Sequence, residues 1–282
     1  MKPSWLKVKV GSGENFYKVM ETIKKEGLHT ICHEANCPNL GECFSRGTAT
    51  FMILGDICTR NCRYCNVKHG KPAKTDYLEP KRIANAVKKL NLKYVVITSV
   101  TRDDLKDYGA KTFRNTIKEI RKISDAKIEI LTPDFNLDIN ALKKVIAIRP
   151  DVFAHNIETV ERLFPTIRPK SNFRRSIVFL KKIKELNPKQ ITKSGMMVGL
   201  GETKKEIIKT IKTLKMAKVD IFTIGQYLQP RKDLAEVKRY YTPDEFLEFK
   251  NIAYKLGFKL VFSGPLVRSS YHAEEAIKCI GG

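Results

Sequence analysis

Residues 51–65 read FMILGDICTRNCRYC and place an apolar run directly before three cysteines. The run 51–54 predicts a first strand, because consecutive apolar residues are typical of a buried strand. Cys58, Cys62 and Cys65 follow in a C-x3-C-x2-C spacing. Three thiolates hold three corners of a cubane iron–sulfur cluster and leave its fourth iron open to another ligand. The stretch therefore predicts an iron–sulfur cluster at the carboxyl end of a strand.

A second cysteine triplet lies upstream, with the spacing C-x4-C-x5-C, and consists of Cys32, Cys37 and Cys43. Two such triplets indicate two clusters, each with one unusual coordination position. Structural zinc is the main alternative, and His33 or His69 lies close enough in sequence to supply a fourth ligand. A disulfide framework is less consistent with the chain, because no apolar signal segment points to an oxidising compartment.

The composition is strongly basic, with 53 Lys and Arg against 30 Asp and Glu and a formal net charge of +23. The lysines are scattered along predicted helices and form no basic tail or nucleic-acid motif, so we expect no nucleic-acid partner. An acidic protein partner or an anionic cofactor explains the charge equally well. No apolar run approaches the ~18 residues of a membrane span, and no targeting segment is visible, so we expect a cytoplasmic protein without a membrane partner.

From residue 51 onward, short β-branched runs alternate with stretches that carry apolar residues at helical spacing. Strands are expected at 51–54, 94–98, 128–131, 152–155, 191–198, 220–224 and 259–262. Helices are expected at 80–90, 111–123, 141–148, 173–186, 202–217 and 243–256. This alternation predicts right-handed βαβ crossovers and a parallel sheet. Six or seven units favour an open or incomplete (β/α) barrel, with functional residues after the strands.

The pattern divides the chain into three parts. Residues 1–50 carry one predicted helix and the upstream triplet, and we interpret them as an extension packed on the mouth of the barrel. Residues 51–262 form the barrel, and residues 263–282 form a carboxyl-terminal segment. Cys279, alone in that last segment, is interpreted as a spare thiol.

The whole chain resembles the lipoyl synthases, a family of radical S-adenosylmethionine enzymes. Besides the two triplets, the matching motifs are KPSWL at 2–6, TSVTRDDL at 98–105, LTPDF at 131–135, HNIETV at 155–160, TKSGMMVGLGE at 192–202, GQYLQP at 225–230 and RSSY at 268–271. The resemblance implies an α/β fold, a partial (β/α)6-type TIM barrel of the radical S-adenosylmethionine kind. It also implies that the amino-terminal extension carries an auxiliary iron–sulfur cluster and that residues 263–282 close the auxiliary site.

The implied activity is that of a sulfurtransferase, which inserts two sulfur atoms at carbons 6 and 8 of a protein-bound N6-octanoyl-lysine. These carbons are unactivated, so a radical cofactor is required. The implied cofactors are S-adenosylmethionine, which gives a 5′-deoxyadenosyl radical, and two [4Fe-4S] clusters, of which the auxiliary one donates the sulfur. The implied partners are octanoylated lipoyl carrier domains of 2-oxoacid dehydrogenase acyltransferase subunits or of the glycine-cleavage carrier protein, and a reductase or a ferredoxin- or flavodoxin-type electron donor.

The resemblance also implies the cluster ligands. The cluster that binds and reduces S-adenosylmethionine is expected on Cys58, Cys62 and Cys65, and the auxiliary cluster on Cys32, Cys37, Cys43 and Ser270. Ser269 is the neighbouring alternative to Ser270, and without the resemblance both serines are interpreted as a polar turn. A serine oxygen is a harder ligand than a thiolate, so iron should leave that corner more readily.

Contacts to S-adenosylmethionine are expected from motif residues after the strands. These residues are Thr98, Ser99, Asn156, Glu158 and Arg174, with Arg175 as the alternative to Arg174. The charges at 102–104 are equally well explained as a network at a helix start, and the glycines at 199–201 as a turn. Asp134 and Gln226 belong to the matched motifs, and the sequence assigns them no role.

Three rival functions remain open at this level. Biotin synthases and tRNA methylthiotransferases insert sulfur by similar chemistry, but the first lack the upstream triplet with RSSY and the second need additional domains. A zinc-stabilised, basic nucleic-acid-binding protein is an alternative of another class. Metal content and product analysis separate these possibilities.

Overall fold

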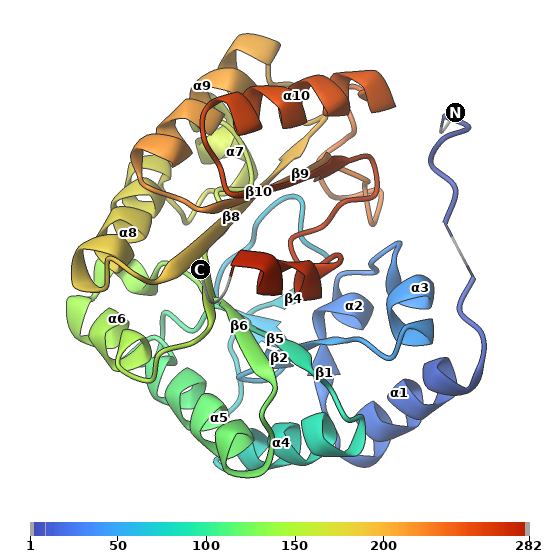
Figure 1. Ribbon diagram of the computed structural model, residues 1–282, viewed down its shortest axis with the longest axis vertical. Helices are drawn as coiled ribbons and strands as arrows, with labels where there is room; N and C mark the ends of the chain where they lie inside the picture. Colours follow the sequence, from blue (N-terminus) through green and yellow to red (C-terminus); the bar gives the residue numbers. More distant parts are fainter. Residues whose placement is uncertain (1–2, 9, 280–282) are drawn as a thin grey trace.

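Seven parallel strands form one curved sheet in the computed structural model, which describes residues 3–8 and 10–279 (Figure 1). These strands are β2 (Thr50–Ile53), β5 (Tyr94–Ser99), β6 (Lys127–Leu131), β7 (Val152–Ala154), β8 (Ile191–Val198), β9 (Ile221–Gln226) and β10 (Leu260–Gly264). The sheet order is β1-β2-β5-β6-β7-β8-β9-β10, and β1 (His29–Thr30) pairs antiparallel with β2. No pairing between described residues joins β1 to β10, so the barrel is open on one side.

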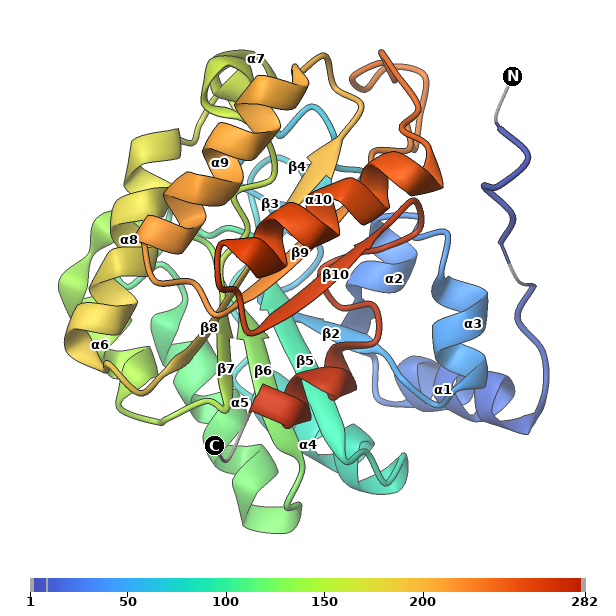
Figure 2. The same ribbon diagram turned by 45° about the horizontal axis from the view of Figure 1, so that its top comes forward.

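A helix follows each of the first six parallel strands and packs on the outside of the sheet (Figure 1, Figure 2). These helices are α4 (Glu79–Lys89), α5 (Ala110–Ile123), α6 (Ile139–Ile146), α8 (Phe173–Leu186), α9 (Lys204–Met216) and α10 (Pro243–Lys255). Short turns lie between them, namely η1 (Phe135–Leu137), η2 (Glu161–Leu163) and α7 (Phe164–Ile167). Six β/α units and a seventh strand confirm the predicted partial barrel. Within residues 3–8 and 10–279, no helix is long and apolar enough to cross a membrane.

Side-chain caps fix where several of these helices begin. Thr203 and Glu206 form a capping box at α9, and Thr242 and Glu245 form one at α10. In a capping box, each side chain satisfies a backbone N–H that the first helical turn leaves unpaired. At α8 a single cap bond forms, in which the Asn172 side chain accepts from the Arg175 N–H, and α8 has the predicted bounds 173–186. The cap at Thr203 explains why α9 starts at 204 rather than at the predicted 202.

The amino-terminal extension contains α1 (Glu14–Lys25), α2 (Ile31–Glu34) and α3 (Leu40–Ser45). α1, which was predicted, packs against α3 and α4. The two shorter helices and β1 were not predicted, because four to six residues show too little periodicity to distinguish them from a loop. Since β1 pairs with β2, the extension adds an edge strand to the barrel sheet as well as packing against it. The division at residue 50 stays a prediction.

The carboxyl-terminal segment covers one end of the barrel interior. Ala273 and Ala276 of η3 (Ala273–Cys279) pack against Tyr94, Val152 and Ile221, which are the first residues of their strands. Figure 2 shows η3, in red, in front of β5, which it contacts. Cys279 lies partly buried at the edge of this cluster. Within this segment, η3 therefore covers the amino ends of these strands, whereas functional residues are expected at the carboxyl ends.

A buried ion pair lies inside the sheet. Lys193 of β8 places its Nζ 2.9 and 3.0 Å from the two carboxylate oxygens of Glu129 on β6. The Tyr94 hydroxyl donates to Glu129 Oε2 at 2.7 Å. Both charged side chains are fully buried, so each depends on the other for its charge compensation.

Candidate active site

One cavity of about 910 Å³ connects the functional motifs of the chain. It is lined by the carboxyl ends of β5 to β9 and continues between the amino-terminal extension and the carboxyl-terminal segment. All six cysteines of the two triplets line it, as do Ser269 and Ser270. The structure thus brings together groups that are more than 200 residues apart in sequence.

The downstream triplet lies on the loop that leaves the sheet after β2. Cys58 ends β3 (Ile57–Cys58), which pairs in parallel with β4 (Lys68–His69) and so closes the loop. The backbone N–H groups of Arg60 and Thr101 donate to Cys58 Sγ at 3.4 and 3.3 Å. Hydrogen bonds to sulfur are one means by which proteins tune iron–sulfur clusters.

Arg60 connects this cysteine loop to the barrel. Its guanidinium donates to Asp103 at 2.8 and 2.9 Å and to Asp134 Oδ1 at 2.7 Å. The other oxygen of Asp134 accepts from Arg175 Nε at 2.7 Å. Burial by itself raises the pKa of Asp134, but the hydrogen bond and charge of Arg60 outweigh burial and hold this pKa below its ordinary value. Asp134 therefore holds the cysteine loop without lining the cavity.

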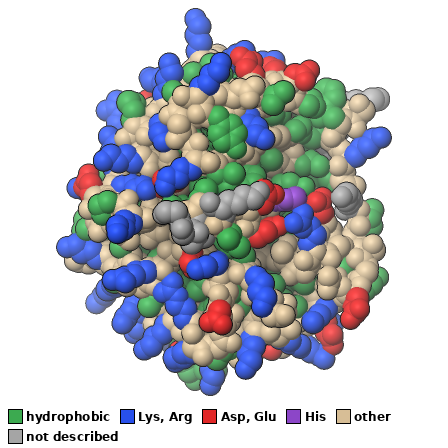
Figure 3. Space-filling view, viewed as in Figure 1, with side chains coloured by type: hydrophobic (Ala, Val, Ile, Leu, Met, Phe, Trp, Pro, Cys, Tyr) green, Lys and Arg blue, Asp and Glu red, His purple; other side chains and the backbone are tan. Residues whose placement is uncertain are grey.

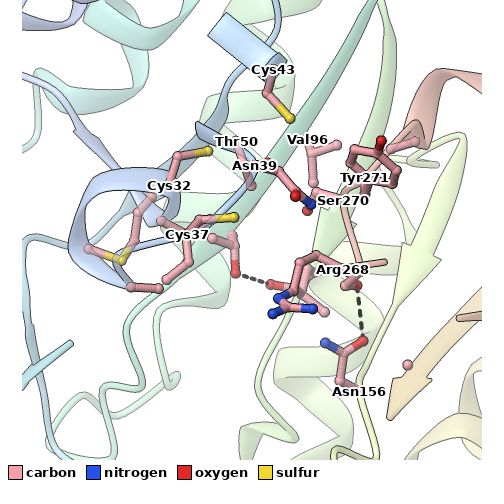
Figure 4. A pocket seen from close by; sticks show the side chains of 18 of the residues that line it. Cys32, Cys37, Asn39, Cys43, Thr50, Val96, Asn156, Arg268, Ser270 and Tyr271 are labelled. Atoms are coloured by element: carbon pink, nitrogen blue, oxygen red, sulfur yellow. Dashed lines mark hydrogen bonds between the residues drawn. The ribbon is translucent and has the colours of Figure 1, made fainter. Parts of the chain in front are cut away.

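The upstream triplet comes from three parts of the extension. Cys32 lies in α2, Cys43 lies in α3, and Cys37 lies in the loop between them. Figure 4 shows the sulfur atoms of all three directed into the same space, toward Ser270. Because this loop follows the edge strand β1, the pairing of β1 with β2 sets its position beside the barrel.

Burial is the main influence on the pKa values of the cysteine thiols in both triplets. It raises the pKa values of Cys32, Cys43 and Cys65 to about 12 and also raises that of Cys62. Neighbouring thiols of the same triplet add to the shift at Cys32, Cys43 and Cys65, while Arg168 opposes it at Cys62. Neutral thiols that are buried in groups become thiolates when a cation binds them, which is the behaviour of metal ligands.

Ser269 and Ser270 differ in their hydrogen bonds. Ser269 Oγ donates to Asn156 Oδ1 at 3.1 Å. Within the described part of the chain, the hydroxyl of Ser270 has no hydrogen-bond partner, and Figure 4 shows Ser270 beside Asn39 and Tyr271. Of the two serines, Ser270 is the one whose oxygen is left for a ligand.

The polar residues predicted at the strand ends line the same cavity. Thr98 Oγ1 donates to the Leu131 carbonyl at 3.0 Å, whereas Ser99 Oγ is buried with no partner among the described residues. Asn156 Nδ2 donates to Glu158 Oε1 at 3.1 Å. Burial raises the pKa of Glu158, and the nearby Arg168 opposes that shift. These groups form a polar patch next to the downstream triplet.

Arg174 lies away from the cavity. Its side chain is 87% exposed and forms an ion pair of 3.2 Å with Glu161. Arg175, the alternative, is bound to Asp134 and does not line the cavity either. The prediction that Arg174 contacts the cofactor has no support from its position.

Arg168 and Arg268, to which sequence reasoning gave no role, are among the arginines that line the cavity. Arg168 is buried and donates to the Ile157 carbonyl at 3.3 Å, with its Nε left without a partner in the described structure. Arg268 opens the RSSY motif, and its Nη1 donates to the Val267 carbonyl at 2.7 Å. Burial lowers the pKa of Arg268, while Cys37 and Glu158 oppose the shift. Arg268 therefore lies between the upstream triplet and the polar patch.

The histidines considered as zinc ligands do not line the cavity. His33 contacts Thr30 and packs its ring against Phe44, and His69 is exposed on β4. Across residues 3–8 and 10–279, no three His, Cys, Asp or Glu side chains converge as ligands of a single ion. Soft sulfur donors in two sets of three, with N–H groups directed at Cys58 Sγ, fit two iron–sulfur clusters.

Other motif residues serve the scaffold. Gly199 and Gly201 adopt φ of +108° and +107°, so the turn interpretation is confirmed. Gln226 is buried and links two loops, with Nε2 donating to the Arg239 carbonyl and Oε1 accepting from the Tyr241 N–H, both at 2.9 Å.

The charges at 102–104 form ion pairs, but not at the helix start where they were expected. Arg102 pairs with Asp104 at 2.8 Å, and Asp103 binds Arg60. α5 begins only at Ala110, so the network does not lie at a helix start. Asp103 instead braces the cysteine loop through its ion pair with Arg60.

Two family models match the chain. The model of the Radical SAM superfamily matches residues 52–214, which is more than half of the chain. The model of the N-terminal domain of lipoyl synthase of the Radical SAM family matches residues 1–37. The two matches cover most of the barrel and much of the amino-terminal extension, respectively.

Full-length relatives are similar to the chain over nearly its whole length. It is 52% identical to the lipoyl synthase of Caldicellulosiruptor saccharolyticus over 280 residues, covering 99% of this chain and 98% of that protein. It is 51% identical to the lipoyl synthase of Caldanaerobacter subterraneus subsp. tengcongensis over 281 residues, covering 100% and 99%.

Solved structures of more distant proteins share the fold. The structure of SuiB of Streptococcus suis bound to S-adenosylmethionine matches with a TM-score of 0.58 at 13% identity, and the match covers 90% of this chain but only 56% of SuiB. The structure of HydG, a maturase of the [FeFe]-hydrogenase, matches with a TM-score of 0.53 at 11% identity, covering 91% of this chain and 73% of HydG. At such identities the likeness is one of fold alone.

Proposed function

The chain belongs to the lipoyl synthase family of radical S-adenosylmethionine enzymes, and from that premise we propose how its residues divide the reaction. Enzymes of this family insert two sulfur atoms at carbons 6 and 8 of a protein-bound N6-octanoyl-lysine, and that is the function of this chain. The observation that supports our assignment of residues is that both cysteine triplets, Ser270 and the polar strand ends line one cavity.

The cysteines and one serine divide into two ligand sets. The first set, for the cluster that binds S-adenosylmethionine, is Cys58, Cys62 and Cys65, and the second, for the auxiliary cluster, is Cys32, Cys37, Cys43 and Ser270. When bound, the two clusters supply the electron that starts the radical reaction and the sulfur that enters the product. The residues of the chain hold these groups in one enclosed space and orient the substrate between them.

The polar patch beside the downstream triplet is assigned to S-adenosylmethionine. Ser99 Oγ supports this, because a buried hydroxyl without a protein partner needs a ligand or water to bond with. Glu158, oriented by Asn156, offers acceptor oxygens for hydroxyl or amino groups. The unpaired Nε of Arg168 suits a carboxylate, so Arg168 takes the role that sequence reasoning gave to Arg174.

Apolar side chains also line part of the wall of the cavity. They include Met52, Val96, Val100, Leu131 and Met196. An octanoyl chain has no group that can form hydrogen bonds along its length, so burial against these side chains is what holds it. We assign this wall to the octanoyl chain.

The direct test is an anaerobic assay on an octanoyl-lysine peptide with S-adenosylmethionine and a reductant. The product is expected to carry two sulfur atoms in place of two hydrogen atoms, as measured by mass spectrometry. Cys279→Ala is the matched control, because this cysteine does not line the cavity and should keep full activity. An unchanged peptide, with both clusters present in the protein, would overturn the proposal.

Long-range electrostatics favour an acidic carrier domain as the bearer of the octanoyl-lysine. Figure 3 shows Lys and Arg side chains spread over the face of the molecule rather than gathered in one patch. With a net charge of +23, the chain attracts an acidic partner from a distance. A carrier domain of a 2-oxoacid dehydrogenase or of the glycine-cleavage system is the proposed substrate, and a reductase or a ferredoxin- or flavodoxin-type protein the proposed electron donor.

Salt dependence tests this steering. Raising the ionic strength shortens the range of the attraction, so the association rate with an acidic carrier domain should fall steeply. Activity on the short octanoyl-lysine peptide should change much less. An association rate that stays flat from low to moderate salt would contradict steering.

A further inference from the structure

Residues 37–46, which comprise α3 and the loop before it and carry Cys37 and Cys43, also hold the carboxyl-terminal segment. Asn39 stands at the N-cap of α3, a position where an asparagine side chain usually caps its own helix. Here the side chain makes no cap hydrogen bond, and its Nδ2 donates to the Leu266 carbonyl at 2.7 Å. Asn39 is only 4% exposed, so this bond is shielded from water.

Two further residues of α3 and its end contact the same segment beyond Ser270. Glu42 Oε1 accepts from the Tyr271 hydroxyl at 3.1 Å. Arg46 pairs with Glu274 and places its Nη1 3.1 Å from His272 Nε2. Each of these contacts joins positions more than 220 residues apart in sequence.

These contacts bracket Ser270. Leu266 lies before it, and Tyr271, His272 and Glu274 lie after it. Residues 37–46, which supply two of the auxiliary cysteines, therefore hold the segment on both sides of the serine. The barrel fixes the other side of the segment. Ser269 bonds Asn156, and the backbone passes so close to Gly225 that a Cβ there would collide with the Val267 carbonyl.

We propose that Asn39, Glu42 and Arg46 form a clasp that positions Ser270 at the auxiliary cysteines, with Asn39 as its strongest member. The three are positioning residues, since they act through the backbone of residues 266–274. The contacts form within the protein itself, so the fourth ligand is in place before a cluster binds. The role given to Ser270 rests on the proposed function, whereas the clasp is a property of the chain alone.

Hydrogen exchange on the metal-free, reduced chain tests the clasp directly. Asn39→Asp replaces the donor by an oxygen that repels the Leu266 carbonyl, so peptides within residues 266–279 should exchange about tenfold faster. Arg46→Glu should have a smaller effect, because its ion pair with Glu274 is partly exposed, and the exchanged pair Arg46→Glu with Glu274→Arg should restore protection.

Matched controls make the same change, amide to carboxylate or cation to carboxylate, elsewhere. Asn251→Asp alters an exposed asparagine of α10, and Lys204→Glu breaks an exposed ion pair with Glu248. Neither control should change exchange within residues 266–279. Wild-type exchange there in Asn39→Asp, or the same acceleration in the controls, would overturn the clasp.

A second readout asks whether the clasp acts through Ser270. In a chain with Cys58, Cys62 and Cys65 changed to alanine, only the auxiliary cluster should form. Its reduced-state electron paramagnetic resonance spectrum in Asn39→Asp should match that of Ser270→Ala, and the double variant should look like Ser270→Ala alone. Additive effects, or a wild-type spectrum in Asn39→Asp, would overturn the positioning role.

The two readouts separate the clasp from the proposed function. If the intact protein inserts no sulfur but Asn39→Asp still accelerates exchange within residues 266–279, the function fails and the clasp stands. If the intact protein is active and the variant shows neither change, only the clasp fails.

Discussion

Asp134→Asn tests whether a residue outside the cavity holds the downstream cysteine loop. Asp134 binds Arg60, which lies between Cys58 and Cys62, and it also binds Arg175. The substitution keeps the shape of the side chain and one acceptor oxygen but removes the negative charge. Arg60 then keeps only Asp103 as its charged partner.

The structure sets the expected size of the effect. The side chain of Asp134 is fully buried and that of Arg60 is 4% exposed. Breaking a buried pair by removing one partner costs ~3–5 kcal/mol. Because Asp103 remains 2.8 Å from Arg60, we expect a loss of about 2–3 kcal/mol in the free energy of unfolding. Asp103→Asn is the matched control; Asp103 is 34% exposed, so its loss should cost about 1 kcal/mol.

Urea unfolding of the reduced, metal-free proteins measures both losses under identical conditions. A functional readout uses chains that also carry alanine at Cys32, Cys37 and Cys43, so that only the downstream cluster forms. In these chains Asp134→Asn should release iron to a chelator faster than Asp103→Asn does. If the two variants lose equal stability and release iron at equal rates, the argument that buried Asp134 holds the loop is refuted.

Three further predictions concern the ligand sets and the buried charges. Cys43→Ala should abolish sulfur insertion yet keep cleavage of S-adenosylmethionine, whereas Cys62→Ala should abolish both, as measured by product and 5′-deoxyadenosine. Lys193→Met should lower the free energy of unfolding by ~3–5 kcal/mol, because it leaves Glu129 fully buried without its partner. Burial lowers the pKa of His155 to about 4. Its contribution of ~3 kcal/mol to the free energy of unfolding is therefore complete above pH ~6.5 and is lost as the pH falls toward 4.

Each of these predictions has an outcome that contradicts it. Loss of cofactor cleavage in Cys43→Ala, with the downstream cluster still bound, would argue against separate ligand sets. Lys204→Met breaks the exposed pair with Glu248 and should cost less than ~1 kcal/mol, so an equal cost for Lys193→Met would refute the buried-pair argument. A His155→Asn variant that keeps the wild-type loss of stability between pH 6.5 and 4 would show that other groups cause it.

The barrel was predictable because its elements are long and strongly patterned. The predicted bounds of α8 and β8 are the observed ones, since apolar periodicity and a capping asparagine act locally. The two cysteine triplets were also visible in the sequence, because ligand spacing is a local property of the chain. That both triplets line one cavity is shown by the structure.

Features that depend on tertiary contacts were not predictable. Arg168 and Arg174 are only six positions apart. Arg168, directly after α7, lines the cavity, whereas Arg174, in the first turn of α8, points to solvent. Nothing in the local sequence distinguishes these two placements. The role of Asp134 needs its contact with Arg60, 74 positions earlier. η3 packs across the amino ends of the strands through Ala273 and Ala276, although its sequence lacks a strong apolar pattern.

The central claim is that one cavity holds two iron–sulfur clusters on two cysteine triplets. Measuring the iron content of the protein, and of variants that lack one triplet, tests it most directly. Anaerobically reconstituted protein should bind about eight irons per chain, and variants that lack either triplet should bind about four. Zinc in place of iron, or one triplet whose removal leaves the iron count unchanged, would contradict the account.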